Sequence, residues 1–355
     1  MSIIDGKNTP MTTSSGAEKA PMTAPPAPEE GRSRKTSWLG VLRFDKFSGL
    51  YLAVILIIIF SLWMPTTFGT PANARVIAAS AAITGIITLA VVVSLAAGVF
   101  DLSLAANMSF SICLLGALIA YLHVPWVLAI LITLVAGGAV GAVNALVITK
   151  LGVDAVIATL GMSSILAALS FWVADGQTIL LTGTNPGFTA LGSASLMSIP
   201  ITVFYLLIVT LLLWFLLEHT PFGRYLYAIG SNAQATRLAG IKVVRLQWAT
   251  LILTGFLASL AGVVLTLQLG AASFGAGLPY LLPAFAAAFL GSTQVLPGRF
   301  NVLGTIVALY LLAIAVKGLQ LQYPDLPWIK DLVEGLVVIV AVAITTRTIK
   351  RPKLA

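Results

Sequence analysis

The chain has 355 residues, of which 59% are hydrophobic and only 9% are charged. Soluble globular domains carry about a quarter charged residues, so this composition excludes an ordinary soluble protein and indicates an all-α polytopic membrane protein. The formal net charge of +8 would suggest a nucleic-acid ligand in a soluble protein. Here the basic residues lie at helix ends and tails, where membrane topology accounts for them, and we expect no nucleic-acid partner.

The first 47 residues are rich in Pro, Ser, Thr, Ala and charge. Such a segment cannot bury enough apolar surface to become ordered, so we expect a disordered N-terminal tail. Positive charge before the first apolar run places this tail in the cytoplasm. The residues that carry it are Arg32, Arg34, Lys35, Arg43 and Lys46.

A transmembrane permease domain is predicted over residues 48–346. A crossing helix needs about 20 mostly apolar residues, and about ten segments qualify, with the eighth weakened by Pro283 and Pro297. Five crossings before the outer loop 175–199 and five after it predict two halves of opposite orientation. The expected helices are 48–65, 73–95, 104–122, 125–148, 154–174, 200–218, 247–268, 281–297, 301–320 and 329–346.

The distribution of charge supports an even number of crossings. Ten crossings return the C-terminus to the cytoplasm, where residues 347–355 form a basic tail. Of the 20 Lys and Arg residues, only Arg75, Lys317 and Lys330 then lie toward the outer face, and the other 17 lie inside. This asymmetry is the positive-inside rule. The segment 96–103 is predicted as a cytoplasmic turn or as a break within a helix.

Small residues recur at helical spacing in two of the expected crossings. Gly137, Gly138 and Gly141 form one such face, and Gly255 and Gly262, with Ser259 between them, form another. Small residues four apart allow helix backbones to approach closely. Packing within the chain is the favoured interpretation, ahead of a subunit interface.

Few charged residues interrupt the apolar segments. We expect Asp101 to cap the following helix, ahead of a functional role inside the membrane. Lys317 and Glu334 are predicted to form a structural ion pair, or the Lys317 side chain extends to the membrane–water interface. Arg299 fits both a topology anchor and a contact with a cytoplasmic subunit.

The sequence lacks the motifs of several catalytic and metal-binding sites. The chain has no phosphate-binding loop, no His-Glu-x-x-His and no Gly-x-Ser-x-Gly, so we expect no catalytic residues and no ATP hydrolysis by the chain alone. The single Cys113 excludes an intramolecular disulfide and a cysteine metal cluster. His123 and His219 are far apart in the sequence and have no ligand spacing, so we expect no metal and no cofactor.

The loop 219–246 differs from the rest of the chain in its mixed polarity. It carries Arg224 and Arg237, which suit carboxylates or carbonyls of a partner. Asn232 is placed to cap a short helix over 232–239, and we expect turns at Gly223, Gly230 and Gly240. From these residues alone, docking of a soluble partner and an amphipathic connector on lipid headgroups are equally supported.

The segment from Gly223 to Ile241 resembles the cytoplasmic loop of the ribose/xylose/galactose-type ABC sugar permeases. The segments 98–103, 156–161, 255–262 and 288–293, with Gly298-Arg299, resemble the same family, in matching order over residues 50–346. The resemblance implies a multi-pass permease subunit in the bacterial cytoplasmic (inner) membrane. It also implies that this subunit moves a monosaccharide by alternating access.

The same resemblance implies several partners beside the lipid bilayer. A separate cytoplasmic ABC ATPase would dock on residues 221–242, and an extracytoplasmic sugar-binding protein would deliver the cargo. A second copy of the chain or a sister permease would complete the pathway. The residues expected to couple to the ATPase are Gly223, Arg224, Gly230, Asn232, Arg237 and Gly240.

Hydroxyl and amide groups suit a sugar without binding it tightly, and they define an expected translocation path: Ser94, Asn107, Ser109, Thr159, Ser163 and Thr266. Two alternatives remain open. A permease for branched-chain amino acids or nucleosides would share this importer class. An ion-coupled secondary transporter would need carboxylates near the midplane, for which Asp101 and Glu334 are the candidates.

Overall fold

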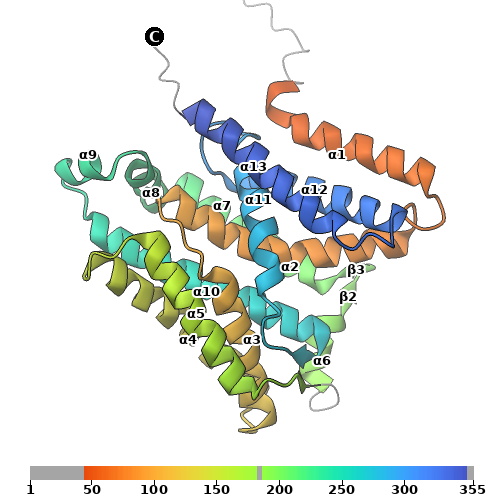
Figure 1. Ribbon diagram of the computed structural model, residues 1–355, viewed down its shortest axis with the longest axis horizontal. Helices are drawn as coiled ribbons and strands as arrows, with labels where there is room; N and C mark the ends of the chain where they lie inside the picture. Colours follow the sequence, from red (N-terminus) through yellow and green to blue (C-terminus); the bar gives the residue numbers. More distant parts are fainter. Residues whose placement is uncertain (1–43, 182–185, 350–355) are drawn as a thin grey trace, which may run out of the picture. The chain divides into compact units, whose positions relative to one another are not determined.

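The computed structural model describes residues 44–181 and 186–349, and it has a helix at each of the ten expected positions (Figure 1). The all-α polytopic fold is therefore confirmed. These helices are α1 (Phe44–Trp63), α2 (Pro71–Ala96), α3 (Leu104–Ala120), α4 (Trp126–Thr149), α5 (Ala155–Ala174), α7 (Ile201–His219), α10 (Val243–Leu269), α11 (Leu281–Gly291), α12 (Val302–Gln322) and α13 (Ile329–Ile349).

Shorter elements connect these helices at both ends. Near the α5–α7 connection lie β1 (Ile179–Leu180), α6 (Pro186–Ser193), β2 (Ser195–Leu196) and β3 (Ile199–Pro200). Between α7 and α10 lie α8 (Pro221–Ser231) and α9 (Ala233–Leu238), and between α10 and α11 lie β4 (Ala271–Ala272) and the 3-10 turn η2 (Leu278–Tyr280). The expected tails fall on residues 1–43 and 350–355, outside the described residues, and α1 already begins at Phe44.

Six of the described helices are long and apolar enough to cross a bilayer: α2, α4, α5, α7, α10 and α12. The helix α3 has 17 residues and α11 only 11, against the roughly 20 that a full crossing needs. The predicted span 281–297 was therefore wrong in length. Residues 292–301 form a loop, in which Val295 and Gly298 adopt φ +55° and +93°, values that an α-helix does not have.

Each short helix follows a long helix and a connecting segment. Residues 97–103 follow α2, and Val99, Asp101 and Ser103 in this segment are buried. The segment passes Gly230 of α8 at Gly98 and continues among the helices, so it has features of both predictions, a turn and a break between helices. Residues 270–280 follow α10, start at Gly270 with φ +62° and are mostly partly exposed.

The two halves pack reciprocally around α2 and α10, which carry much of the buried core. In the first half α3 and α4 pack against α10, and in the second half α11 and α12 pack against α2. The order of long and short helices is the same in the set α2–α5 and in the set α10–α13. Two helix sets with the same order of lengths, each packed on the long first helix of the other, are the arrangement expected for inverted repeats.

Glycines bring α4 and α10 into backbone contact, as the small-residue pattern predicted. A Cβ on Gly141 would lie 2.0 Å from the carbonyl oxygen of Leu251, and a Cβ on Gly255 would lie 2.4 Å from that of Gly137. Ser259 adds a hydrogen bond from its Oγ to the carbonyl of Thr133 at 2.8 Å. The small-residue faces thus serve packing within the chain.

We predict that Gly141→Leu destabilises the fold, because its side chain has no space beside the α10 backbone. Overpacking costs about 1–3 kcal/mol or more, so the midpoint of thermal unfolding in detergent should fall by several degrees. Gly138→Ala is the matched control, since a Cβ there would meet Ile252 at an ordinary 3.8 Å. Equal unfolding temperatures for both variants would contradict the contact.

Candidate functional site

One end of the helix bundle carries most of the described positive charge. At this end lie the C-termini of α4 and α7, the N-termini of α10 and α12, and the segment α8–α9 (Figure 1). The positive-inside rule assigns this inner end to the cytoplasm. Its basic residues are Lys150, Arg224, Arg237, Lys242, Arg245 and Arg299.

The helix α8 is amphipathic and lies against the bundle. Pro221 begins it, at a position where a missing N–H costs nothing. Its buried face holds Leu226 and Ile229, while Arg224 and Tyr225 are exposed on the other side. The sequence therefore folds this part of the loop onto the ends of α2, α7 and α10 and leaves one arginine face open.

Two of the three glycines in this segment do not form the predicted turns. Gly223 and Gly230 lie inside α8, where they permit close approach instead of chain reversal. A Cβ on Gly223 would lie 2.0 Å from the carbonyl oxygen of Leu217, and one on Gly230 would lie 2.4 Å from that of Ala96. Gly240 does form a turn, with φ +82°.

The short helix predicted over 232–239 is confirmed as α9, together with its cap. The Oδ1 atom of Asn232 accepts a hydrogen bond from the backbone N–H of Ala235 at 2.9 Å. Thr236 is buried, whereas Arg237 is exposed and Leu238 is 90% exposed.

A three-residue cluster connects α8 to the loop 292–301. The guanidinium of Arg299 forms an ion pair with Glu218 at the end of α7 and lies 4.3 Å from the ring centroid of Tyr227 on α8. The Tyr227 hydroxyl donates a hydrogen bond to the carbonyl of Phe300 at 2.9 Å. Burial, and then the Glu218 carboxylate, raise the pKa of Tyr227, so the phenol keeps the proton it donates.

Sequence reasoning missed this cluster. Glu218 and Arg299 are 81 positions apart, and no local pattern indicates their pairing. Arg299 therefore binds Glu218 within the chain. The two roles predicted from the sequence, a topology anchor and a contact with a cytoplasmic subunit, stay predictions. Asn301 fixes the same loop: its Nδ2 donates to the carbonyl of Gln294 at 3.1 Å, and its Oδ1 accepts from the N–H of Gly304 at 2.7 Å.

The prediction that Asp101 caps α3 was wrong: Ser103 occupies the N-cap position, and Asp101 lies two residues before it and binds Ser103 instead of a first-turn N–H. The Oδ1 of Asp101 accepts hydrogen bonds from the backbone N–H of Ser103 at 3.0 Å and from the Ser103 hydroxyl at 2.6 Å. The amide of Asn144 donates to the same hydroxyl at 2.8 Å. The carboxylate is thereby held by the break between α2 and α3.

Two of the six expected path residues, both on α5, bind the backbone of the first break. The Thr159 hydroxyl accepts from the N–H of Leu102 at 3.2 Å, and the Ser163 hydroxyl donates to the carbonyl of Leu102 at 2.9 Å. These hydroxyls thus satisfy both backbone groups of Leu102.

The second break is held by Ser109, whose hydroxyl accepts from the N–H of Gly277 at 3.0 Å. Asn107 donates to the carbonyls of Gly137 and Gly255 at 3.2 and 3.1 Å, where α4 and α10 cross. In this conformation these side chains connect helices.

Ser94 and Thr266 complete the expected path residues. Both are buried, and their hydroxyls donate to carbonyls of their own helices. Four of the six residues thus bind neighbouring helices or breaks, and none of the six lines the cavity between α1, α2 and α12. Their exposure to a pathway stays a prediction.

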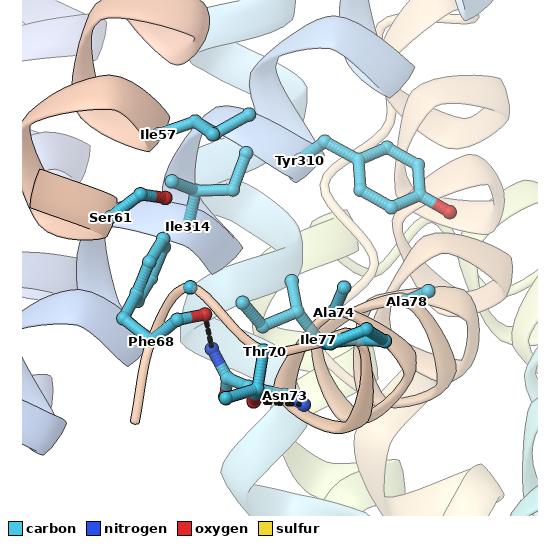
Figure 2. A pocket seen from close by; sticks show the side chains of 12 residues that line it. Ile57, Ser61, Phe68, Thr70, Asn73, Ala74, Ile77, Ala78, Tyr310 and Ile314 are labelled. Atoms are coloured by element: carbon cyan, nitrogen blue, oxygen red, sulfur yellow. Dashed lines mark hydrogen bonds between the residues drawn. The ribbon is translucent and has the colours of Figure 1, made fainter. Parts of the chain in front are cut away.

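An apolar cavity of about 390 Å³ lies between α1, α2 and α12 (Figure 2). Asn73 and Thr70 are already engaged there: the Nδ2 of Asn73 donates to the carbonyl of Phe68 at 3.0 Å, and the N–H of Asn73 donates to the Thr70 hydroxyl at 3.2 Å. Figure 2 shows Ile57, Ile314 and Ile77 around the same space, together with Ser61 and Tyr310. The lining is mostly apolar and suits hydrocarbon.

The family of this chain follows from comparison with known proteins. The model of the family described as "Branched-chain amino acid transport system / permease component" matches residues 73–342. The chain belongs to this family. It is a transport permease subunit and a multi-pass protein of the cytoplasmic membrane, and its resemblance to the ABC permeases is confirmed.

Relatives of this permease align along most of their length. A ribose import permease protein of Bacillus subtilis is 35% identical over 300 residues, covering 84% of this chain and 91% of the relative. A D-allose transport system permease protein of Escherichia coli is 28% identical, covering 88% and 95%. An L-arabinose ABC transporter permease protein of Azospirillum brasilense is 29% identical, covering 82% and 85%. No solved structure matches the chain.

We predict an energetic coupling between Glu218 and Arg299. Arg299→Leu and Glu218→Gln should each lower the thermal unfolding midpoint of the permease, and the double variant should lose less than the two losses added together. The Arg299 side chain is 40% exposed, so solvent screening limits the coupling to about 1 kcal/mol. Additive losses would show that the pair contributes no stability.

Proposed function

We propose that this permease moves a monosaccharide across the cytoplasmic membrane as one subunit of an ABC importer. One observation carries the proposal: relatives named for ribose, allose and arabinose transport each align with more than 80% of this chain. Alignment of that extent covers both helix sets and the segment α8–α9. The individual sugar is left to experiment.

A separate cytoplasmic ATPase would dock on α8 and α9. The coupling residues are Gly223, Arg224, Gly230, Asn232, Arg237 and Gly240. The exposed arginines and the exposed Leu238 support this proposal, because they offer charge and apolar surface on short, rigid helices. The glycines act indirectly, since two of them seat α8 on the bundle and Gly240 turns the chain toward α10.

The contacts of α8 support a route by which such a partner would act. Gly230 touches the backbone at the end of α2, and Tyr227 binds Phe300, just before α12 begins. Displacement of α8 would therefore move α2 of the first half and α12 of the second half together. Rigid-body movement of packed helices between two arrangements is a common form of switching, and it would open the path alternately to each side.

Two further partners complete the importer. An extracytoplasmic binding protein would deliver the sugar, and a second copy of the chain or a sister permease would supply the other wall of the path. Ser94, Asn107, Ser109, Thr159, Ser163 and Thr266 are proposed to meet the sugar in another conformation. That would require their present hydrogen bonds to helix backbones to exchange.

The alternatives have weaker support. The relatives named above transport sugars, which does not favour an amino-acid or nucleoside cargo. A secondary transporter would need free midplane carboxylates. Asp101 is buried and hydrogen-bonded to Ser103, and Glu334 lies in the second turn of α13, 4.0 Å from the ammonium of Lys330. That pairing replaces the predicted pair of Lys317 with Glu334.

We predict that Arg224→Glu abolishes sugar uptake, because the reversed charge would repel the acidic or carbonyl groups that an exposed arginine binds. Uptake of labelled sugar into cells should fall to background, while the amount of permease in the membrane stays unchanged. Arg224→Lys keeps the charge and should retain a substantial fraction of uptake. Normal transport by the Glu variant would rule out docking at this face.

We also predict the class of cargo. Cells that produce the permease with its neighbouring binding protein should take up a labelled pentose or hexose. Unlabelled leucine or adenosine in large excess should not reduce that uptake, whereas the unlabelled sugar should reduce it at least tenfold. Uptake of leucine in place of the sugar would move the chain to the amino-acid branch of its family.

A further inference from the structure

Two of the three outward-lying basic residues of this chain share one cavity. Lys317 on α12 and Lys330 on α13 both line a space of about 450 Å³ at the outer end of the bundle, bounded by α2, α10, α11, α12 and α13. Basic residues are scarce on the outer side of membrane proteins. The third, Arg75, is exposed near the start of α2 and does not line this cavity.

The cavity is polar at its outer rim and apolar inside. Gln268, Gln320 and Glu334 stand with the two lysines near the helix ends, while Ile83 and Leu312 line the deeper wall. Three hydroxyl side chains also line the cavity, those of Ser80, Thr84 and Tyr280, and the protons of the first two are used within α2. Ser80 donates to the carbonyl of Val76 at 2.9 Å, and Thr84 donates to that of Ser80 at 3.2 Å.

The side chains that line the cavity carry a net positive charge, and the exposed Asp331, beside Lys330 on α13, does not line it. Lys330 lies 4.0 Å from Glu334, and Lys317 has no ion-pair partner within residues 44–181 and 186–349. Two ammonium groups and one carboxylate leave an excess of one positive charge. Lys317 stands five residues before the end of α12, or about 8 Å along the helix axis. Its flexible stem extends to the headgroup layer from that depth.

We propose that this cavity binds one anionic phospholipid of the outer leaflet, with the headgroup phosphate between Lys317 and Lys330 and an acyl chain along the apolar wall. A polar, cationic rim above an apolar wall matches an amphiphile with an anionic head. A sugar would instead need hydrogen-bonding groups around its whole perimeter, and the inner wall is mostly apolar. The lipid would bridge α2 of one helix set and α10–α13 of the other.

The test measures lipid selectivity of the purified full-length permease. The protein is extracted in mild detergent, titrated with phosphatidylglycerol or with zwitterionic phosphatidylethanolamine, and examined by native mass spectrometry. Basic residues near a membrane surface each favour anionic lipid severalfold, so wild-type protein should bind phosphatidylglycerol about tenfold more tightly. Two variants test the site: Lys317→Gln combined with Lys330→Gln, and Val316→Phe, which narrows the cavity without changing charge.

The double variant should lose the preference to below about twofold, and Val316→Phe should weaken binding of both lipids. Arg75→Gln is the matched control and should behave as wild type. Equal binding of the two lipids by wild-type protein, or an unchanged preference in the double variant, would overturn the proposal. Displacement of the lipid by inorganic phosphate would indicate a free-anion site instead, and displacement by ribose would indicate a sugar site.

A variant that fails to fold does not prevent a decision, because wild-type selectivity and both displacement experiments use the native chain. Elution as a single species in size-exclusion chromatography checks the folding of each variant. The lipid site is independent of the proposed cargo. Normal sugar uptake with no lipid preference would reject the lipid site alone.

Discussion

The fold depends on one constraint: every backbone polar group inside a bilayer must find a partner within the protein. The breaks at 97–103 and 270–280 create such groups where α3 and α11 begin. Hydroxyls from neighbouring helices satisfy them, notably Thr159 and Ser163 at Leu102, and Ser109 at Gly277. The short helices that begin at these breaks pack on the long helix of the opposite half, α3 on α10 and α11 on α2. The breaks therefore account both for the polar side chains in the core and for the reciprocal packing.

At the inner end, α8 and α9 differ in how firmly they are attached to the bundle. Because α8 rests on glycine contacts and is held to the loop 292–301 through Tyr227 and Arg299, it is a rigid extension of the bundle. By contrast, α9 exposes Arg237 and Leu238 and has few buried side chains of its own. Under the proposed docking, α8 would transmit displacement and α9 would receive the partner.

Local patterns in the sequence predicted much of this structure. Hydropathy placed nine of the ten helices within four residues at each end, and α11 ends six residues before its predicted end. Small-residue spacing found the α4–α10 contact, and Asn232 marked the start of α9. Two of the errors share a physical cause. Whether Gly223 and Gly230 turn the chain or admit a neighbouring backbone depends on what lies beside them. The pairing of Glu218 with Arg299 likewise depends on tertiary placement that no window of sequence contains. The pairing of Lys330 with Glu334, in place of Lys317 with Glu334, is a local i,i+4 contact on α13 that helical spacing could have indicated.

The central claim is that a separate ATPase acts on this chain through α8 and α9. The most direct test is to purify the permease in mild detergent from its own cells and to measure ATP hydrolysis by the preparation, for the wild-type chain and for a variant that lacks the segment 221–242. The account predicts that an ATPase subunit and its activity accompany the wild-type chain and are absent from the deletion variant. Recovery of the wild-type chain alone, with sugar uptake that persists when ATP is depleted and the ion gradient is kept, would contradict it.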